Sequence, residues 1–358
     1  MLDSLQEMNK QKNKEKNESY LEYLSRELVF DGCQSNGLTC ASMFCGGGGL
    51  DLGFTAAGFD VVFSSDLEKI YCDTIKHNLK KDFAEPFDIK DLTGNIIKNK
   101  SGKDIDFLIG GPPCQSFSIL GSRKSLDDPR GKLVFEYGRI INDLNPRGFL
   151  FENVPGLMTI NGGEDWKNLI SFFKEKTNFH IFYGKLNSVR YGVPQFRERV
   201  FIIGLRDIGE FSWPTGTFSV GNDLIEPLAK RAFTVEDAFK SLEGTFNNEL
   251  RKHGERVTNR YSAVLPGDRD RVDHTDRLRS DRPSGTVLVG SGGGGGRPFI
   301  HPSEHRHITV REAARLQSFP DWWKFSGGPT AQYRQVGNAV PPLMAKSLAK
   351  SILEHLKG

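Results

Sequence analysis

The chain has 358 residues, enough for one large domain and a smaller one around a substantial core. No stretch approaches the ~20 apolar residues of a membrane helix. The N-terminus lacks a signal-peptide pattern, and five scattered cysteines do not form a disulfide framework, so we expect a cytoplasmic protein. The formal net charge of +3 permits nucleic-acid binding without arguing for it.

Residues 1–36 form a charged leader in which four apolar side chains at helical spacing predict a short amphipathic helix: Tyr20, Leu21, Leu24 and Leu28. Residues 37–210 then alternate between strand and helix patterns. Strands are expected at 38–44, 60–65, 106–109, 148–151, 182–186 and 200–204, and helices at 68–79 and 133–144. This alternation predicts an α/β fold with a doubly wound, mostly parallel sheet that binds ligands at the carboxyl ends of its strands.

Beyond residue 210 the alternation gives way to mixed charges and irregular turns. We expect residues 211–327 to form a second, smaller domain with a connecting motif, and residues 328–358 to return to the first domain. The run Ser291–Gly296 is expected to be a flexible loop. A helix at 309–317 is predicted to begin at a Thr309 cap with Glu312 three residues on, and a last helix is predicted at 342–356.

A glycine-rich turn, FCGGGGLDLG at Phe44–Gly53, directly follows the first predicted strand. Glycine lets the backbone approach a ligand closely, but a dehydrogenase or a purely structural turn would show the same pattern. Asp66, at the end of the next strand, either holds the two hydroxyls of a ribose or caps the following helix. Asp88 follows an extended segment and could accept a hydrogen bond from an adenine amino group.

The segment GGPPCQSFS at Gly110–Ser118 comes immediately after a short buried strand. Two prolines restrict the backbone before Cys114, which favours a rigidly placed, reactive thiolate over an inert buried cysteine. Glu152, in the ENV segment after another strand, is expected on the same side of the sheet. A cysteine beside a carboxylic acid suits covalent attack on a ring that must be activated by protonation, while a surface ion pair is the alternative for Glu152.

Arg197 and Arg199 alternate along an extended segment, so both guanidinium groups lie on one face. They suit phosphate or carbonyl oxygens, and solvated arginines are the ordinary alternative. His301, His305 and His307 have no cysteine partners nearby, so no metal site is expected.

In order along the chain, the glycine turn, PPCQSFS, ENV, QFRER and QVGNAVP at Gln335–Pro341 resemble the DNA (cytosine-5)-methyltransferase family of bacterial restriction–modification systems. The resemblance runs from about Leu38 to the C-terminus. It implies a class I S-adenosylmethionine-dependent methyltransferase fold with a DNA-recognition domain. It also implies methyl transfer to carbon 5 of a cytosine that is flipped out of a specific duplex sequence.

The family's roles carry over onto matching residues. Cys114 is implied as the nucleophile on carbon 6, Glu152 as the acid at N3, and Arg197 and Arg199 as a clamp. The implied S-adenosylmethionine contacts are Phe44, Gly46, Gly48, Gly49, Asp66, Leu67, Asp88, Ile89, Pro113, Leu133, Asn338 and Val340. Leu67 departs from the aromatic residue that the family often stacks on adenine.

The resemblance also implies contacts to double-stranded DNA. The implied DNA-binding residues are Ser118, Gln195, Thr286 and Val287, and residues 115–132 resemble the family's mobile loop over DNA. The arginine-rich stretch 269–282 supplies phosphate and guanine contacts or, because aspartates alternate with the arginines, a neutral solvated face. A monomer is expected, with a restriction endonuclease sharing its recognition sequence as a partner.

Three rival functions follow from the same residues. An RNA cytosine-5 methyltransferase would share the fold. However, a long segment separates QFRER at Gln195–Arg199 (the arginine motif) from QVGNAVP at Gln335–Pro341 (the last motif), and this segment favours DNA. An inactive homologue acting as a binding module is opposed by the presence of Cys114, Glu152 and Asn338. A nicotinamide dehydrogenase would have no use for PPCQ together with ENV.

Overall fold

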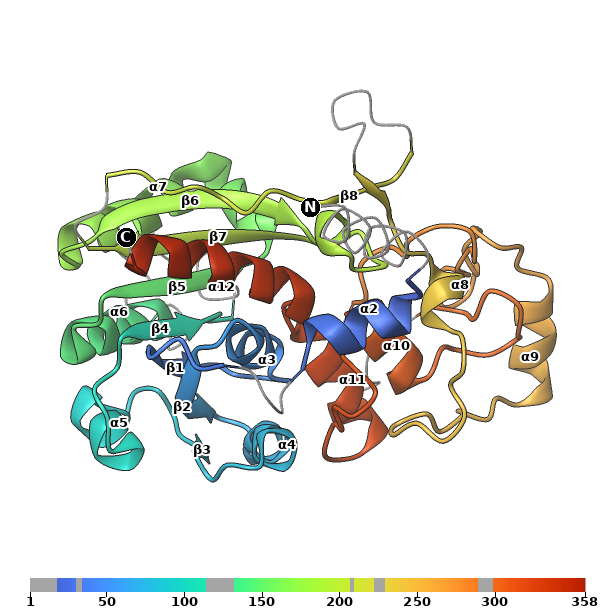
Figure 1. Ribbon diagram of the computed structural model, residues 1–358. Coiled ribbons are helices and arrows are strands. Elements are labelled where there is room, and N and C mark those ends of the chain that lie inside the picture. Colours follow the sequence, from blue (N-terminus) through green and yellow to red (C-terminus); the bar gives the residue numbers. More distant parts are fainter. Residues whose placement is uncertain are drawn as a thin grey trace, which may run out of the picture.

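A seven-stranded sheet organises the first half of the protein (Figure 1). The computed structural model describes residues 18–29, 34–113, 132–206, 209–221, 229–288 and 299–357. The strands are β1 (Thr39–Met43), β2 (Asp60–Asp66), β3 (Ala84–Pro86), β4 (Phe107–Gly110), β5 (Gly148–Asn153), β6 (His180–Asn187) and β7 (Glu198–Leu205). Their order is β3-β2-β1-β4-β5-β7-β6, and β7 runs antiparallel to both of its neighbours while the other pairs are parallel. The predicted doubly wound, mostly parallel sheet is therefore confirmed.

Helices cover both faces of this sheet because successive strand residues point to opposite sides. In β4, Phe107 and Ile109 join the core under α3 (Gly49–Ala56) and α12 (Pro342–Lys357), whereas Leu108 joins the core on the other face. That second core is closed by α5 (Gly94–Ser101), α6 (Lys132–Leu144) and α7 (Glu164–Lys176). Helix α4 (Lys69–Leu79) packs beside β2 and β3.

A buried carboxyl group links the first two strands to α3. Asp51, in the first turn of that helix, accepts hydrogen bonds from Ser42 Oγ in β1 at 3.0 Å and from Ser64 Oγ in β2 at 2.5 Å. Removal of this carboxyl group from water raises its pKa to about 6. The two serines partly offset that cost and fix the start of α3 against the strand ends.

After β7, where the sequence predicts a second, smaller domain, most of the described chain lies to one side of the sheet, and we refer to this part as the second domain (Figure 1). It contains β8 (Phe218–Ser219), β9 (Lys230–Arg231), α8 (Val235–Ala238) and α9 (Glu255–Ser262). Then come α10 (Val310–Leu316) and α11 (Pro329–Asn338), before α12 returns to the sheet. The predicted capping box is present: Thr309 Oγ1 accepts from Glu312 N at 3.1 Å, and a Glu312 carboxylate oxygen accepts from Thr309 N at 2.6 Å.

The predicted leader helix is α2 (Tyr20–Glu27), and it is part of the core. The Tyr20 hydroxyl is buried and donates to the Arg315 carbonyl oxygen of α10 at 2.6 Å. At the other end of the helix, Glu27 pairs with Lys346 of α12 at 2.8 Å. Helix α2 therefore bridges the second domain and the helix that covers the sheet. In the described ranges, no helix is long and apolar enough to cross a bilayer.

Candidate active site

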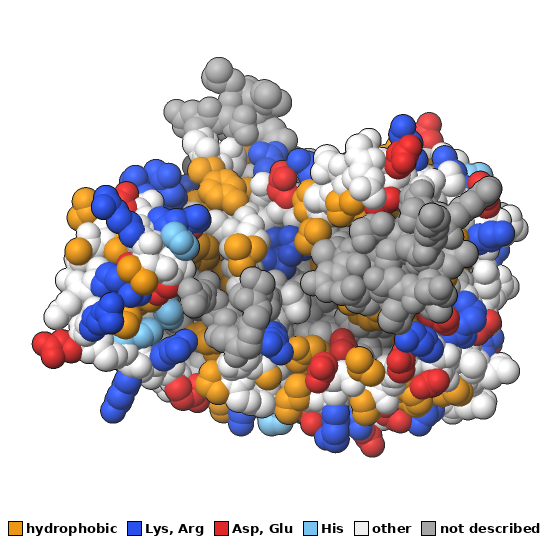
Figure 2. Space-filling model, turned by 180° about the vertical axis from the view of Figure 1, so that it is seen from behind, with side chains coloured by type: hydrophobic (Ala, Val, Ile, Leu, Met, Phe, Trp, Pro, Cys, Tyr) orange, Lys and Arg blue, Asp and Glu red, His pale blue; other side chains and the backbone are white. Residues whose placement is uncertain are grey.

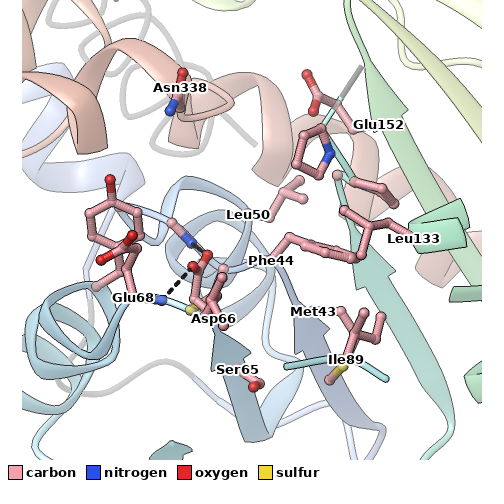
Figure 3. A pocket seen from close by; sticks show the side chains of 18 of the residues that line it. Met43, Phe44, Leu50, Ser65, Asp66, Glu68, Ile89, Leu133, Glu152 and Asn338 are labelled. Carbon is pink, nitrogen blue, oxygen red and sulfur yellow. Dashed lines mark hydrogen bonds between the residues drawn. The ribbon is translucent and has the colours of Figure 1, made fainter. Parts of the chain in front are cut away.

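A cavity of about 700 Å³ opens at the carboxyl ends of β1, β2, β4 and β5. This is the edge where a parallel α/β sheet binds its ligands. Most of the residues predicted to bind the cofactor line it: Phe44, Gly46, Gly49, Asp66, Leu67, Asp88, Ile89, Pro113, Leu133, Asn338 and Val340. Glu152 and Arg199 line it too, and Figure 3 shows Glu152 at the opposite end from Asp66 and Glu68. Cys114 and Ser118 lie outside the described residues.

The glycine turn serves packing as much as ligand access. A Cβ on Gly47 would lie 2.7 Å from the Gln335 carbonyl oxygen, and one on Gly49 would lie 2.0 Å from that of Val340. Gly48, predicted to line the cavity, instead faces Ile75, only 2.4 Å from where its Cβ would be, and it is not among the lining residues. Gly46 has a φ of +53°, and a Cβ there would meet only the Phe44 carbonyl oxygen, 3.9 Å away, so among Gly46–Gly49 it has the most room for a ligand.

Asp66 closes the turn from the neighbouring strand. Its carboxylate accepts from Gly46 N at 3.0 Å and from Glu68 N at 3.1 Å (Figure 3). The N-cap residue of α4 is Glu68, so Asp66 is not the helix cap that the sequence left open. Burial raises the pKa of Asp66, and the two backbone N–H groups counteract that rise. The carboxylate is thus fixed against the glycine turn while it lines the cavity.

Two aromatic residues that the sequence analysis did not identify line the cavity near Leu67. The Leu67 side chain is 68% exposed, so it offers little of a fixed stacking surface. Tyr71 lies in the first turn of α4, and Phe87 directly precedes Asp88. The available signal was their place in the sequence, because Phe87 adjoins the candidate Asp88 and Tyr71 begins the helix that follows the candidate Asp66.

Glu152 lies at the carboxyl end of β5, largely buried, with its Oε1 2.9 Å from Arg199 Nε. Burial raises the pKa of Glu152, whereas Arg199 and Arg197 act to lower it. The next residue, Asn153, donates from Nδ2 to the Pro112 carbonyl oxygen at 2.9 Å. This bond ties the ENV segment to the PPC segment. Pro113, the residue before Cys114, lines the same cavity as Glu152.

The two arginines of the predicted clamp do different things. Arg199 lines the cavity and pairs with Glu152. Arg197 is fully buried, with Nη1 donating to the Val287 carbonyl oxygen at 3.1 Å and Nη2 to that of Gly337 at 2.6 Å. Burial lowers the pKa of Arg197 well below its ordinary value, and its Nε has no hydrogen-bond partner within the part of the chain that the structure describes.

Three of the residues predicted to bind DNA have polar groups engaged within the protein. Gln195 is fully buried and Val287 nearly so. Thr286 Oγ1 donates to the Phe196 carbonyl oxygen at 2.8 Å. The segment from Gly285 to Leu288 therefore lies against the arginine motif, and Gln195 supports it from within.

The arginine-rich stretch is largely paired within the protein. Arg269 pairs with Asp276 and Arg279 with Asp281, each at 2.6 Å, and Arg277 donates to the Tyr261 carbonyl oxygen at 2.6 Å. These contacts favour the neutral, solvated alternative. Among the described residues no group of three or more His, Cys, Asp or Glu side chains is placed to hold a metal ion.

Comparisons with known proteins agree with this geometry. The family model of C-5 cytosine-specific DNA methylases matches residues 38–354. The Type II methyltransferase M1.HphI of Haemophilus parahaemolyticus is 35% identical, with 93% of this chain and 90% of that protein covered. M.MthTI of Methanothermobacter thermautotrophicus is 36% identical, with 89% and 98% covered.

Solved structures show the same fold. A DNA modification methyltransferase encoded within an Escherichia coli prophage superposes with a TM-score of 0.72 at 27% identity, covering 90% of this chain and 100% of that one. The Schizosaccharomyces pombe Dnmt2 methyltransferase superposes with a TM-score of 0.65 at 20% identity over 90% of this chain and 100% of that one, which supports the fold alone. With its motifs, its cavity and these relatives in agreement, the chain belongs to the C-5 cytosine-specific DNA methylase family.

Proposed function

We propose that this enzyme methylates carbon 5 of a cytosine flipped out of duplex DNA, through transient covalent attack of Cys114 on carbon 6. One observation carries the proposal. All but one of the residues expected to hold S-adenosylmethionine line a single cavity with the buried Glu152–Arg199 pair, and so does the residue that precedes Cys114.

The donor set of the cavity fits S-adenosylmethionine, the methyl donor that the family and fold imply. At one end Asp66 offers a fixed carboxylate for ribose hydroxyls. Apolar side chains also line the cavity: Leu50 and Phe44 lie between Asp66 and Glu152 in the view of Figure 3, and Met43 and Ile89 lie on the side away from Glu152. When bound, S-adenosylmethionine supplies an electrophilic methyl group on a sulfonium sulfur.

The protein's own groups must make carbon 5 of cytosine nucleophilic. The Cys114 thiolate adds to carbon 6 while Glu152 donates its proton to N3, which leaves an enamine whose carbon 5 accepts the methyl group. Loss of the carbon 5 proton to a base then expels the thiolate, and return of the N3 proton to the Glu152 carboxylate restores the neutral aromatic ring. Burial supports the role of Glu152 because a raised pKa keeps its proton available, and Arg199 holds the carboxyl group in place.

Base flipping is part of the proposal because neither carbon can be reached in stacked duplex DNA, and it costs a few kcal/mol. Figure 2 shows Lys and Arg side chains gathered over the second domain, at the left of that view. Such a surface attracts phosphates. We expect the DNA to be held between this domain and the opening of the cavity.

The Type II methyltransferase names of the relatives support a biological role. We propose that the enzyme acts in the cytoplasm and protects host DNA from a restriction endonuclease that recognises the same sequence. We also propose that it acts as a monomer, because its own helices cover both faces of the described sheet.

A transfer assay with S-adenosylmethionine labelled in its methyl group tests the reaction. Purified protein is incubated with duplex genomic DNA or with total tRNA, and bisulfite sequencing of the DNA then locates the methylated cytosines. Label on DNA, at carbon 5 of cytosine in one short sequence, is expected. Label on tRNA alone would favour the RNA-methylating alternative, and label on adenine would refute the proposed chemistry.

A further inference from the structure

Two buried glutamine side chains meet between the cofactor cavity and the second domain. Gln195 precedes β7 and Gln317 follows α10, and both are 0% exposed. Gln195 Nε2 donates to Gln317 Oε1 at 2.6 Å and to the Leu316 carbonyl oxygen at 3.0 Å. Buried amides need such partners. A fully buried pair of side chains therefore specifies one relative position of the segment before β7 and the segment after α10.

One end of the pair holds Val287. The Val287 backbone N–H donates to Gln195 Oε1 at 3.0 Å, and the Val287 carbonyl oxygen accepts from Arg197. Next to it, Ser284 N donates to the Pro194 carbonyl oxygen at 3.0 Å. Both polar groups of the Val287 peptide are thus fixed by side chains of the arginine motif.

The other end of the pair holds the last motif. Gln317 Nε2 donates to the carbonyl oxygens of Val336 at 2.8 Å and Ala339 at 3.0 Å. Arg197 bonds to Gly337 between them. Asn338, Ala339 and Val340 line the cofactor cavity.

The last motif also packs tightly against the glycine turn. Gly47 and Gly49 lie so close to the backbone of Gln335 and Val340 that neither glycine could carry a methyl group. A shift of the glycine turn must therefore move the last motif or break contacts in a close-packed region.

We propose that Gln317, acting through Gln195, is a positioning residue that couples occupation of the cofactor cavity to the conformation of residues 284–288. The hydrogen bonds all run in one direction, from Val287 N–H through both glutamine side chains to the Val336 carbonyl oxygen. Hydrogen bonds that form such a chain strengthen one another. The inference rests on the proposed cofactor site but not on the covalent mechanism. Filling the cavity strengthens the hold on residues 284–288, which lie against the arginine motif, before DNA arrives.

Hydrogen–deuterium exchange with mass spectrometry tests this coupling, with S-adenosylhomocysteine at saturation as the probe. In the wild-type protein the probe should slow amide exchange both at residues 46–49 and at residues 284–288. In Gln317→Met, whose side chain has similar length and no amide, protection at 46–49 should remain. Protection at 284–288 should fall about 5-fold or more, the lower bound of typical coupling between sites.

Gln332→Met is the matched control. Gln332 is also buried and lies in α11, but its amide donates to Gly327 and Phe325 of its own segment. It should keep both protections. If Gln317→Met does not fold, Gln195→Met breaks the same relay and should give the same result.

Three outcomes would overturn the inference. The first is full protection at 284–288 in the folded variant. The second is protection of the wild-type protein at residues 46–49 without any at residues 284–288. This outcome would remove the coupling but keep the proposed cofactor site. The third is no wild-type protection at 46–49, which would remove the proposed cofactor site as well.

Discussion

Replacing Glu152 by glutamine removes its proton and its charge but keeps an oxygen that can accept from Arg199 Nε, now 2.9 Å from the carboxylate. Because protonation of N3 by a positioned acid is worth about 10²–10⁴-fold in rate, kcat for methyl transfer should fall by that factor. The affinity for S-adenosylhomocysteine should change little, since Asp66 lies at the other end of the cavity (Figure 3). Single-turnover transfer from labelled S-adenosylmethionine to duplex DNA gives the rate.

The same substitution should act in the opposite direction on stability. Burial raises the pKa of Glu152, so its ionised form costs about 1.4 kcal/mol for each unit of that rise. The protonated form of Glu152 avoids this cost, so its contribution to the free energy of unfolding is fully present below the unfolded pKa, about 4.3. The contribution is lost as pH rises through the folded pKa. Urea unfolding of Glu152→Gln against wild type should therefore favour the variant more at pH 8 than at pH 5. A rate within threefold of wild type, or the reverse pH trend, would refute the reasoning.

Three further predictions concern packing and buried polar groups. Because burial raises the pKa of Asp51 from 3.8 to about 6, the free energy of unfolding of the wild-type protein should fall by about 3 kcal/mol as pH rises from 4 to 6. Urea unfolding of Asp51→Asn should no longer show this fall, and an unchanged pH profile would contradict the prediction. Gly49→Ala places a Cβ 2.0 Å from a carbonyl oxygen and should abolish S-adenosylhomocysteine binding by calorimetry, whereas Gly156→Ala, with open space around it, should bind normally. Tyr20→Phe should lower the free energy of unfolding by about 1–3 kcal/mol, and Tyr183→Phe, on a half-exposed side chain, by less than about 0.5 kcal/mol; equal losses would remove the bridging role of α2.

Periodicity predicted six of the seven strands of the sheet, together with α4, α6 and α12, because their apolar patterns are local. It missed β3, whose three residues are too few to show an alternating pattern. It also failed in places where the pattern was present. Helix α7 carries Trp166, Leu169, Ile170 and Phe173 at helical spacing, yet it begins after glycine-rich turns that obscured its start. The short α5 offers few apolar residues, so its start is fixed by the Thr93 cap more than by periodicity.

Two acidic residues of the cavity could be predicted because parallel strands end at one edge of the sheet, which places Asp66 and Glu152 at the two ends of one cavity. The support of the site could not. Gly47 and Gly49 are glycines because the chain returns to them nearly 300 residues later. The family resemblance implied a DNA contact for Gln195, and only the packing of Val287 and Gln317 against it reveals a buried relay.

Trapping the covalent intermediate tests the central claim most directly. A duplex carrying the target sequence found by bisulfite sequencing, with 5-fluorocytosine at the methylated position, is incubated with the protein and S-adenosylmethionine. Fluorine cannot leave as a proton does, so wild-type protein should remain bonded to the DNA in denaturing gels, with the added mass on the peptide that contains Cys114. An adduct formed by Cys114→Ala, or active wild-type enzyme that forms none, would contradict the account.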